Sequence, residues 1–84
     1  MFYGVIIAMY FFDTGKHKRP HIHVKYQGEE AVISIPDGEV IQGNIQINKI
    51  KLVQAWVEIH PNELMADWEL AVNGQEVFKI EPLK

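Results

Sequence analysis

The hydrophobic pattern of this chain changes its period once, near Gly43 and Asn44, and this change limits the folds that the chain can adopt. Before that point, apolar and polar residues alternate, which is the two-residue period of a β-strand. After it, apolar residues recur every three or four positions, which is the period of a helix. Strands followed by helices indicate an α+β domain. Because 84 residues supply only one core, we expect a single domain over residues 1–84.

The first half of the sequence predicts an antiparallel β-meander of about four strands. Val5–Phe12 is apolar on both faces, which indicates a strand that is central or covered on both sides. His21–Tyr26 alternates, with apolar side chains at its even-numbered positions and polar ones at its odd-numbered positions. The other two strands are Ala31–Ile35 and Glu39–Gln42, and the turn residues Pro36-Asp37-Gly38 join them.

The second half predicts two helices. The first covers Asn48–Ile59, with Asn48 as its N-cap. Pro61 interrupts the pattern, because a proline disfavours helical geometry in the residue before it. The second helix follows with Asn62 as its cap, and Asn73-Gly74 forms its C-terminal stop.

Trp56 and Trp68 fall on the apolar stripes of these two helices, and we interpret both as core anchors because an indole buries a large area. The two stripes predict that the helices pack on one face of the sheet. After the second helix, the β-forming residues of Val77–Ile80 predict a short C-terminal strand.

Charge is unevenly distributed along the chain, whose formal net charge is −3. From Thr14 to Gly28 there is no acid, while three of the four histidines lie there with four basic residues, Lys16, Lys18, Arg19 and Lys25. The rest of the chain holds the other four basic residues and all eleven acids, a charge of −7. Such a segment favours a phosphate, a nucleic acid strand or an acidic partner surface. A solvated basic loop is the alternative interpretation.

His21 and His23 are the most informative pair in that segment. Because they are two residues apart on a strand, their side chains lie on one face, with Cα atoms roughly 6–7 Å apart. That face is the polar one, so we expect both rings to be exposed rather than buried in a core. Such a pair can act as general acid and base, can contact phosphate when protonated, or can bind a metal.

A metal site would need a third ligand beside the histidine pair. The candidates are His17, Glu58, His60 and Glu63. His60 ends the first helix, where the helix dipole stabilises an imidazolium, and this structural role is one interpretation. The other is that the helices bring His60 to the histidine strand and complete a three-histidine site.

Several classes of protein are excluded by what the sequence lacks. Without cysteine there are no disulfides, thiol nucleophiles or thiolate metal sites, which suits a reducing cytosol. The apolar run near the N-terminus is too short to span a membrane. There is no phosphate-binding glycine loop, zinc finger or basic recognition helix. We therefore expect a cytoplasmic protein without a cofactor and without a membrane partner.

Eight segments together resemble a family of small prokaryotic proteins, the domain of unknown function 4160. They are Phe2–Phe11, Pro20-His21-Ile22-His23-Val24-Lys25-Tyr26, Ala31–Gly43, Leu52–His60, Glu63-Leu64, Trp68-Glu69-Leu70-Ala71, Asn73-Gly74 and Lys79–Leu83. The second is similar to the motif Pro-His-Phe-His-Val-x-Tyr. The resemblance implies that His21, His23 and His60 belong to a family pattern. It also implies a neighbouring gene for another small protein, an arrangement like that of toxin–antitoxin pairs.

We therefore consider three functions. The first is a toxin-like component of a two-gene bacterial module that contacts RNA or another phosphate-bearing ligand through the histidine strand. If it cleaves RNA, His21 and His23 are the candidate acid and base, with His60 as a further candidate, and Arg19 and Lys25 bind the phosphate. The second is a non-enzymatic interaction module that forms a homodimer or a complex with the neighbouring gene product. The third is a histidine-ligated metal protein.

Overall fold

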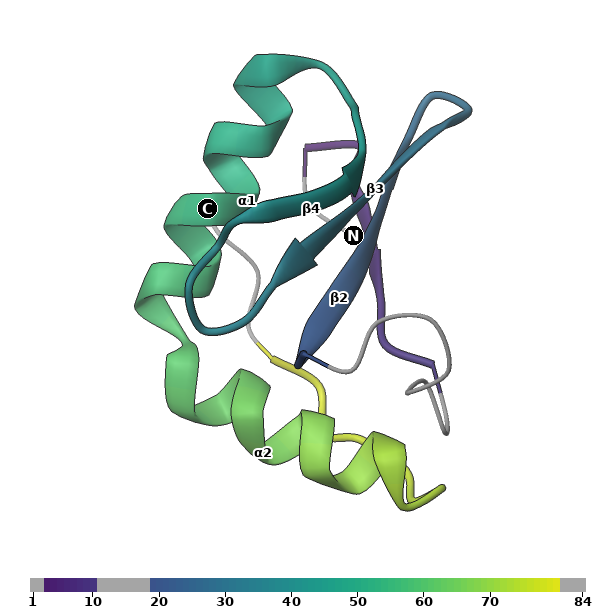
Figure 1. Ribbon diagram of the computed structural model, residues 1–84, viewed down its shortest axis with the longest axis vertical. Helices are drawn as coiled ribbons and strands as arrows, with labels where there is room; N and C mark the ends of the chain where they lie inside the picture. The colour runs from purple at the N-terminus through teal and green to yellow at the C-terminus, as the bar shows by residue number, and fades with distance from the viewer. Residues whose placement is uncertain (1–2, 11–18, 81–84) are drawn as a thin grey trace.

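Figure 1 shows the computed structural model of the protein, which describes residues 3–10 and 19–80. Four strands form one antiparallel sheet in the order β1-β2-β3-β4, and two helices follow, so the predicted α+β class is confirmed. The elements are β1 (Ile6–Ala8), β2 (His21–Tyr26), β3 (Glu29–Ser34), β4 (Val40–Gly43), α1 (Ile47–Ile59) and α2 (Pro61–Val72).

The register of the strands assigns every side chain to one of two faces of the sheet. Ile22 lies opposite Ile33 in the pairing of β2 with β3, and both side chains are fully buried on the face that carries the core. His23 lies one residue further along β2, so its side chain is on the other face. A two-residue turn with positive φ angles at Gln27 and Gly28 fixes this register.

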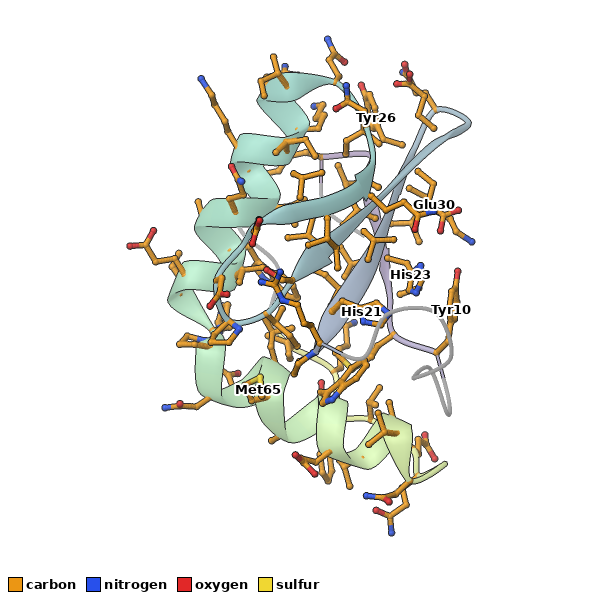
Figure 2. The ribbon with its side chains drawn as sticks, viewed as in Figure 1. Tyr10, His21, His23, Tyr26, Glu30 and Met65 are labelled. Carbon is orange, nitrogen blue, oxygen red and sulfur yellow. The ribbon has the colours of Figure 1, made fainter. Side chains whose placement is uncertain are left out.

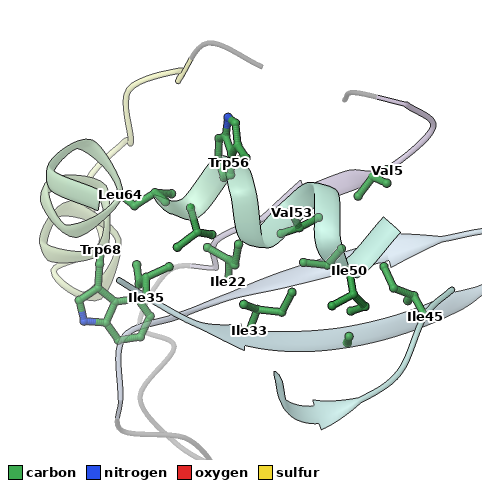
Figure 3. Close-up of a cluster of buried hydrophobic side chains, with 13 residues drawn as sticks. Val5, Ile22, Ile33, Ile35, Ile45, Ile50, Val53, Trp56, Leu64 and Trp68 are labelled. Atoms are coloured by element: carbon green, nitrogen blue, oxygen red, sulfur yellow. The ribbon is translucent and has the colours of Figure 1, made fainter. Parts of the chain in front are cut away.

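The core lies between the first face of the sheet and the helices. From α1, Ile50, Val53 and Val57 are buried against β2 and β3. Figure 3 shows that Leu64 and Trp68 from α2 continue this cluster beyond the end of the sheet. Trp56 and Trp68 are each 5% exposed, which confirms the prediction that both tryptophans are core anchors.

The first strand differs from the prediction in extent and position. The described strand covers Ile6–Ala8, and positions 11 and 12 of the predicted span lie outside the described residues. β1 stands at an edge of the described sheet, so the prediction of a central or doubly covered strand is wrong. Val5 is buried in the core, but Ile6 on the opposite face is half-exposed, so the second apolar face of this strand is not fully covered.

Both predicted helix caps are also wrong. α1 is capped by Gln46, whose carbonyl accepts hydrogen bonds from the backbone N–H groups of Lys49 and Ile50. α2 begins at Pro61, with His60 as its N-cap, because proline needs no hydrogen-bond partner at the first helical position and its φ suits a helix. Asn48 and Asn62 therefore lie inside the first turns of the two helices.

The segment after α2 runs back along the core without forming a strand. Asn73 caps the helix and Gly74 has a φ of 71°, so the predicted stop is confirmed. The predicted strand over residues 77–80 is wrong. One reason is that the Phe78 backbone N–H donates to the Asp67 carboxylate of α2 at 3.0 Å rather than to a neighbouring strand. Neither helix in the described part of the chain is long and apolar enough to cross a bilayer.

Candidate functional site

The face of the sheet opposite α1 carries a cluster of polar and aromatic side chains. Figure 2 shows Tyr10, His21, His23 and Glu30 along this side of the sheet. Lys25 belongs to the same face, because it lies opposite Glu30 in the pairing of β2 with β3. We call these five residues the histidine face.

His23 is held at the centre of the histidine face by two neighbours. Its Nδ1 atom lies 3.2 Å from Oε2 of Glu30, and its ring centroid lies 4.4 Å from that of Tyr10. The His23 side chain is 14% exposed and Glu30 is half-exposed, so the pair is in contact with solvent. A carboxylate beside one ring nitrogen fixes the ring orientation, which is a common arrangement for a histidine that transfers protons or binds anions.

Lys25 adds a positive charge beside the exposed Tyr10. Its ammonium nitrogen lies 5.6 Å from the centroid of the Tyr10 ring. A hydrogen bond with Tyr10 raises the pKa of the Lys25 ammonium, and the negative charge of Glu30 acts in the same direction. Lys25 is therefore cationic at neutral pH. An imidazole, an aromatic ring and an ammonium group thus lie together on one accessible surface.

His21 differs from His23 in burial, so the prediction that both rings are exposed is wrong for His21. Only 1% of its surface is exposed. Its ring centroid lies 4.9 Å from that of Trp68 and 5.2 Å from that of His23. Its Nδ1 lies 2.7 Å from the backbone oxygen of Arg19, and because a carbonyl only accepts, Nδ1 carries a proton and donates. His21 is therefore the buried member of the histidine face, beside His23 and against Trp68.

His60 occupies the corner between the two helices. Its Nδ1 lies 2.7 Å from Oε1 of Glu63, and its ring centroid lies 5.8 Å from that of Trp56. Its backbone N–H donates to the Trp56 carbonyl, and its own carbonyl accepts from Leu64. His60 thus ends α1 and starts α2, which gives it a structural role at that corner.

The structure also bears on the predicted metal site. Over residues 3–10 and 19–80, no three histidine and carboxylate side chains are grouped closely enough to hold a metal ion. The predicted third ligands Glu58, His60 and Glu63 therefore do not form such a group with the histidine pair. His17, the other candidate, lies outside the described residues.

Arg19 forms ion pairs with two carboxylates of the β3–β4 hairpin. Its Nη2 atom lies 3.1 Å from Oδ2 of Asp37 and 3.1 Å from Oε1 of Glu39. The stretch Thr14–Gly28 contains no acid, but three acids from β3 and the β3–β4 hairpin contact it in the fold. Asp37 and Glu39 pair with Arg19, and Glu30 lies beside His23. Lys16 and Lys18, the other cations of that stretch, lie outside the described residues.

Tyr10 and Glu30 belong to the histidine face but were not predicted as site residues, although the sequence pattern indicates the position of each. The two-residue turn after Tyr26 places Glu30 opposite Lys25 once the hairpin is paired. Tyr10 follows Ile6 and Ala8 at two-residue spacing, which places it on their face of the first strand.

The fold and this site define a small α+β protein with one accessible face of histidine, tyrosine and lysine side chains. A family model described as domain of unknown function (DUF4160) matches residues 4–69 of the 84-residue chain. The chain belongs to this family, as the resemblance of its motifs indicated. No curated protein and no solved structure matches the chain.

Proposed function

We propose that this protein is a cytoplasmic, toxin-like component of a two-gene bacterial module that binds RNA through the histidine face. The single observation that carries the proposal is the position of His23, between the Glu30 carboxylate and the Tyr10 ring, with the Lys25 ammonium alongside. Support for the two-gene module comes from the family resemblance, which implies a neighbouring gene for a second small protein.

The chemistry of Tyr10, His23 and Lys25 suits a single nucleic acid strand. An ammonium and an imidazolium both donate to phosphate oxygens. An exposed tyrosine ring on a sheet offers a surface on which a base can stack, and single-stranded RNA is commonly recognised in this way. Lys25 is a better candidate for phosphate contact than Arg19, because Arg19 would first have to break its ion pairs with Asp37 and Glu39.

RNA cleavage would use the same groups. Neutral His23 would accept the proton of a 2′-hydroxyl as this oxygen attacks the adjacent phosphorus, and the imidazolium so formed would give this proton to the 5′-oxygen as it leaves. Lys25 would stabilise the charge on the phosphate oxygens. His21 is buried, so we assign it a positioning role beside His23. His60 is paired with Glu63 at the helix corner and is not part of this proposal.

Substitutions on the histidine face should weaken RNA binding. We expect His23→Ala and Lys25→Ala each to raise the Kd for a fluorescently labelled single-stranded RNA by roughly tenfold, the cost of about one charge-assisted hydrogen bond. Fluorescence anisotropy measures this change. His60→Ala is the matched control, because it removes the same side chain, also paired with a carboxylate, at a different place.

Two results would reject the RNA proposal. One is a wild-type protein that binds no RNA at low salt, where phosphate contacts are strongest. The other is a His23→Ala protein that binds RNA as tightly as the wild type.

The toxin role has a separate test. Growth arrest on expression should be lost in His23→Ala and retained in His60→Ala, and full toxicity of His23→Ala would contradict the toxin role.

A second candidate function, a protein-interaction module, is favoured by the edge of the sheet. β1 has one described neighbour, β2, and its Ile6 side chain is 50% exposed. Exposed backbone and apolar side chains on an edge strand can pair with a strand of another chain. Solution mass measurements should then detect a dimer, or a complex with the neighbouring gene product, that Ile6→Lys disrupts and His23→Ala leaves intact. A monomer with no such complex would reject this function.

A further inference from the structure

A second candidate site lies on the core side of the sheet, away from the histidine face. It is an open pocket of about 270 Å³ lined by residues of β1, β2, both helices and the segment 77–80. Its walls are mostly apolar, with Ile7 and Met9 on one side and Ile22, Trp56 and Leu64 on the others. Figure 3 shows the last three converging from β2, α1 and α2.

One buried acid interrupts this apolar lining. Asp67 of α2 is 5% exposed and forms part of the pocket wall. Its Oδ1 atom accepts a hydrogen bond from the Phe78 backbone N–H at 3.0 Å, which also holds residues 77–80 against the pocket. In the described part of the chain, no lysine, arginine or histidine forms an ion pair with Asp67.

The charge of Asp67 is therefore poorly compensated. Burial raises the pKa of the Asp67 carboxyl, because its ionised form loses water; the Phe78 N–H partly offsets this and Glu63 adds to it. Lys79 also lines the pocket, but it is exposed, so solvent screens its charge. A cationic group inside the pocket would supply the ion-pair partner that Asp67 lacks among residues 3–10 and 19–80.

The volume limits the size of a ligand. A cavity of roughly 150 Å³ is large enough to hold benzene, so the larger space here accommodates a ring with a short side chain. We propose that this pocket binds a small aromatic amine, with the ring between Trp56 and Leu64 and the ammonium group at the Asp67 carboxylate. This site is independent of the RNA proposal, because none of the five residues of the histidine face lines the pocket.

Phenethylamine is a suitable probe, and binding is measured by titrating the ¹⁵N-labelled full-length protein. We expect saturable NMR shifts at pocket residues, including the indole N–H of Trp56. Asp67→Asn should raise the Kd by roughly tenfold or more, because it removes the charge while its side-chain oxygen still accepts from Phe78. Glu69→Gln, an exposed charge change on the same helix, is the matched control and should leave the Kd unchanged.

Two further comparisons make the test specific. Phenylpropionate, an anionic probe of similar shape, should bind more weakly than phenethylamine. Val77→Phe should abolish binding of both probes, because the larger side chain fills the pocket from the wall formed by residues 77–80. The proposal is overturned if phenethylamine causes no saturable shifts at the pocket, if Asp67→Asn binds it as tightly as the wild type, or if phenylpropionate binds more tightly.

Discussion

Replacing Gly43 by alanine is expected to lower the free energy of unfolding by about 3 kcal/mol or more, because two penalties combine at this position. The Gly43 backbone has a φ of 72°, a left-handed conformation that costs an alanine about 1–2 kcal/mol. A Cβ atom would also meet the carbonyl oxygen of Glu30 and the Cα atom of Ala31 in β3. Because these are backbone atoms, relief requires β3 and β4 to separate. Chemical denaturation measures the change.

Gly28→Ala is the matched control for this substitution. Gly28 has a similar φ of 82°, but an added Cβ would have no neighbour within 4 Å. It should therefore lose only about 1–2 kcal/mol, the conformational part of the cost. Equal losses in the two variants would contradict the packing described for β3 and β4. Gly43→Ala should also disturb His23, since the displaced backbone carries Glu30.

The second large effect is expected at His21. We expect His21→Ala to destabilise the protein by about 2–3 kcal/mol, because it leaves a cavity beside Trp68 and removes the hydrogen bond to the Arg19 carbonyl. His23→Ala should cost about 1 kcal/mol or less, since its side chain is partly exposed and its carboxylate partner remains hydrated. Thermal and chemical denaturation of the two variants measure the difference.

These two histidines test the division of roles within the histidine face. His23→Ala should keep the fold and lose RNA binding, whereas His21→Ala should lose stability first. If His21→Ala were as stable as the wild type, His21 would not have the supporting role that its burial indicates. A His23→Ala protein that unfolds at room temperature would show that His23, too, is mainly structural.

The sequence predicts the local elements well where one periodic pattern dominates. The alternation over His21–Tyr26 marks both ends of β2 correctly, because one face of that strand packs on the core while the other carries polar side chains. The stop at Asn73 and Gly74 is equally local, since it depends on the conformational freedom of one glycine. Prediction of the last strand fails because β propensity at residues 77–80 does not provide a pairing partner.

The candidate site is predicted only in part, because contacts between distant segments decide it. The alternation places His21 and His23 on one face, but the burial of His21 depends on Trp68, which lies 47 residues further along the chain. The charge of Arg19 is likewise paired by Asp37 and Glu39 across the hairpin. The order of residues along the sequence reveals neither the contact of His21 with Trp68 nor the ion pairs of Arg19.

The most direct test of the RNA proposal is an NMR titration of the ¹⁵N-labelled protein with a short single-stranded RNA, observing backbone amides and the His23 ring. We predict saturable shifts centred on Tyr10, His23, Lys25 and Glu30, with none at His60, and we predict that Lys25→Ala weakens the titration. Shifts that cluster at the helix corner, or a His23 ring that RNA leaves unchanged, would contradict the assignment of RNA binding to the histidine face.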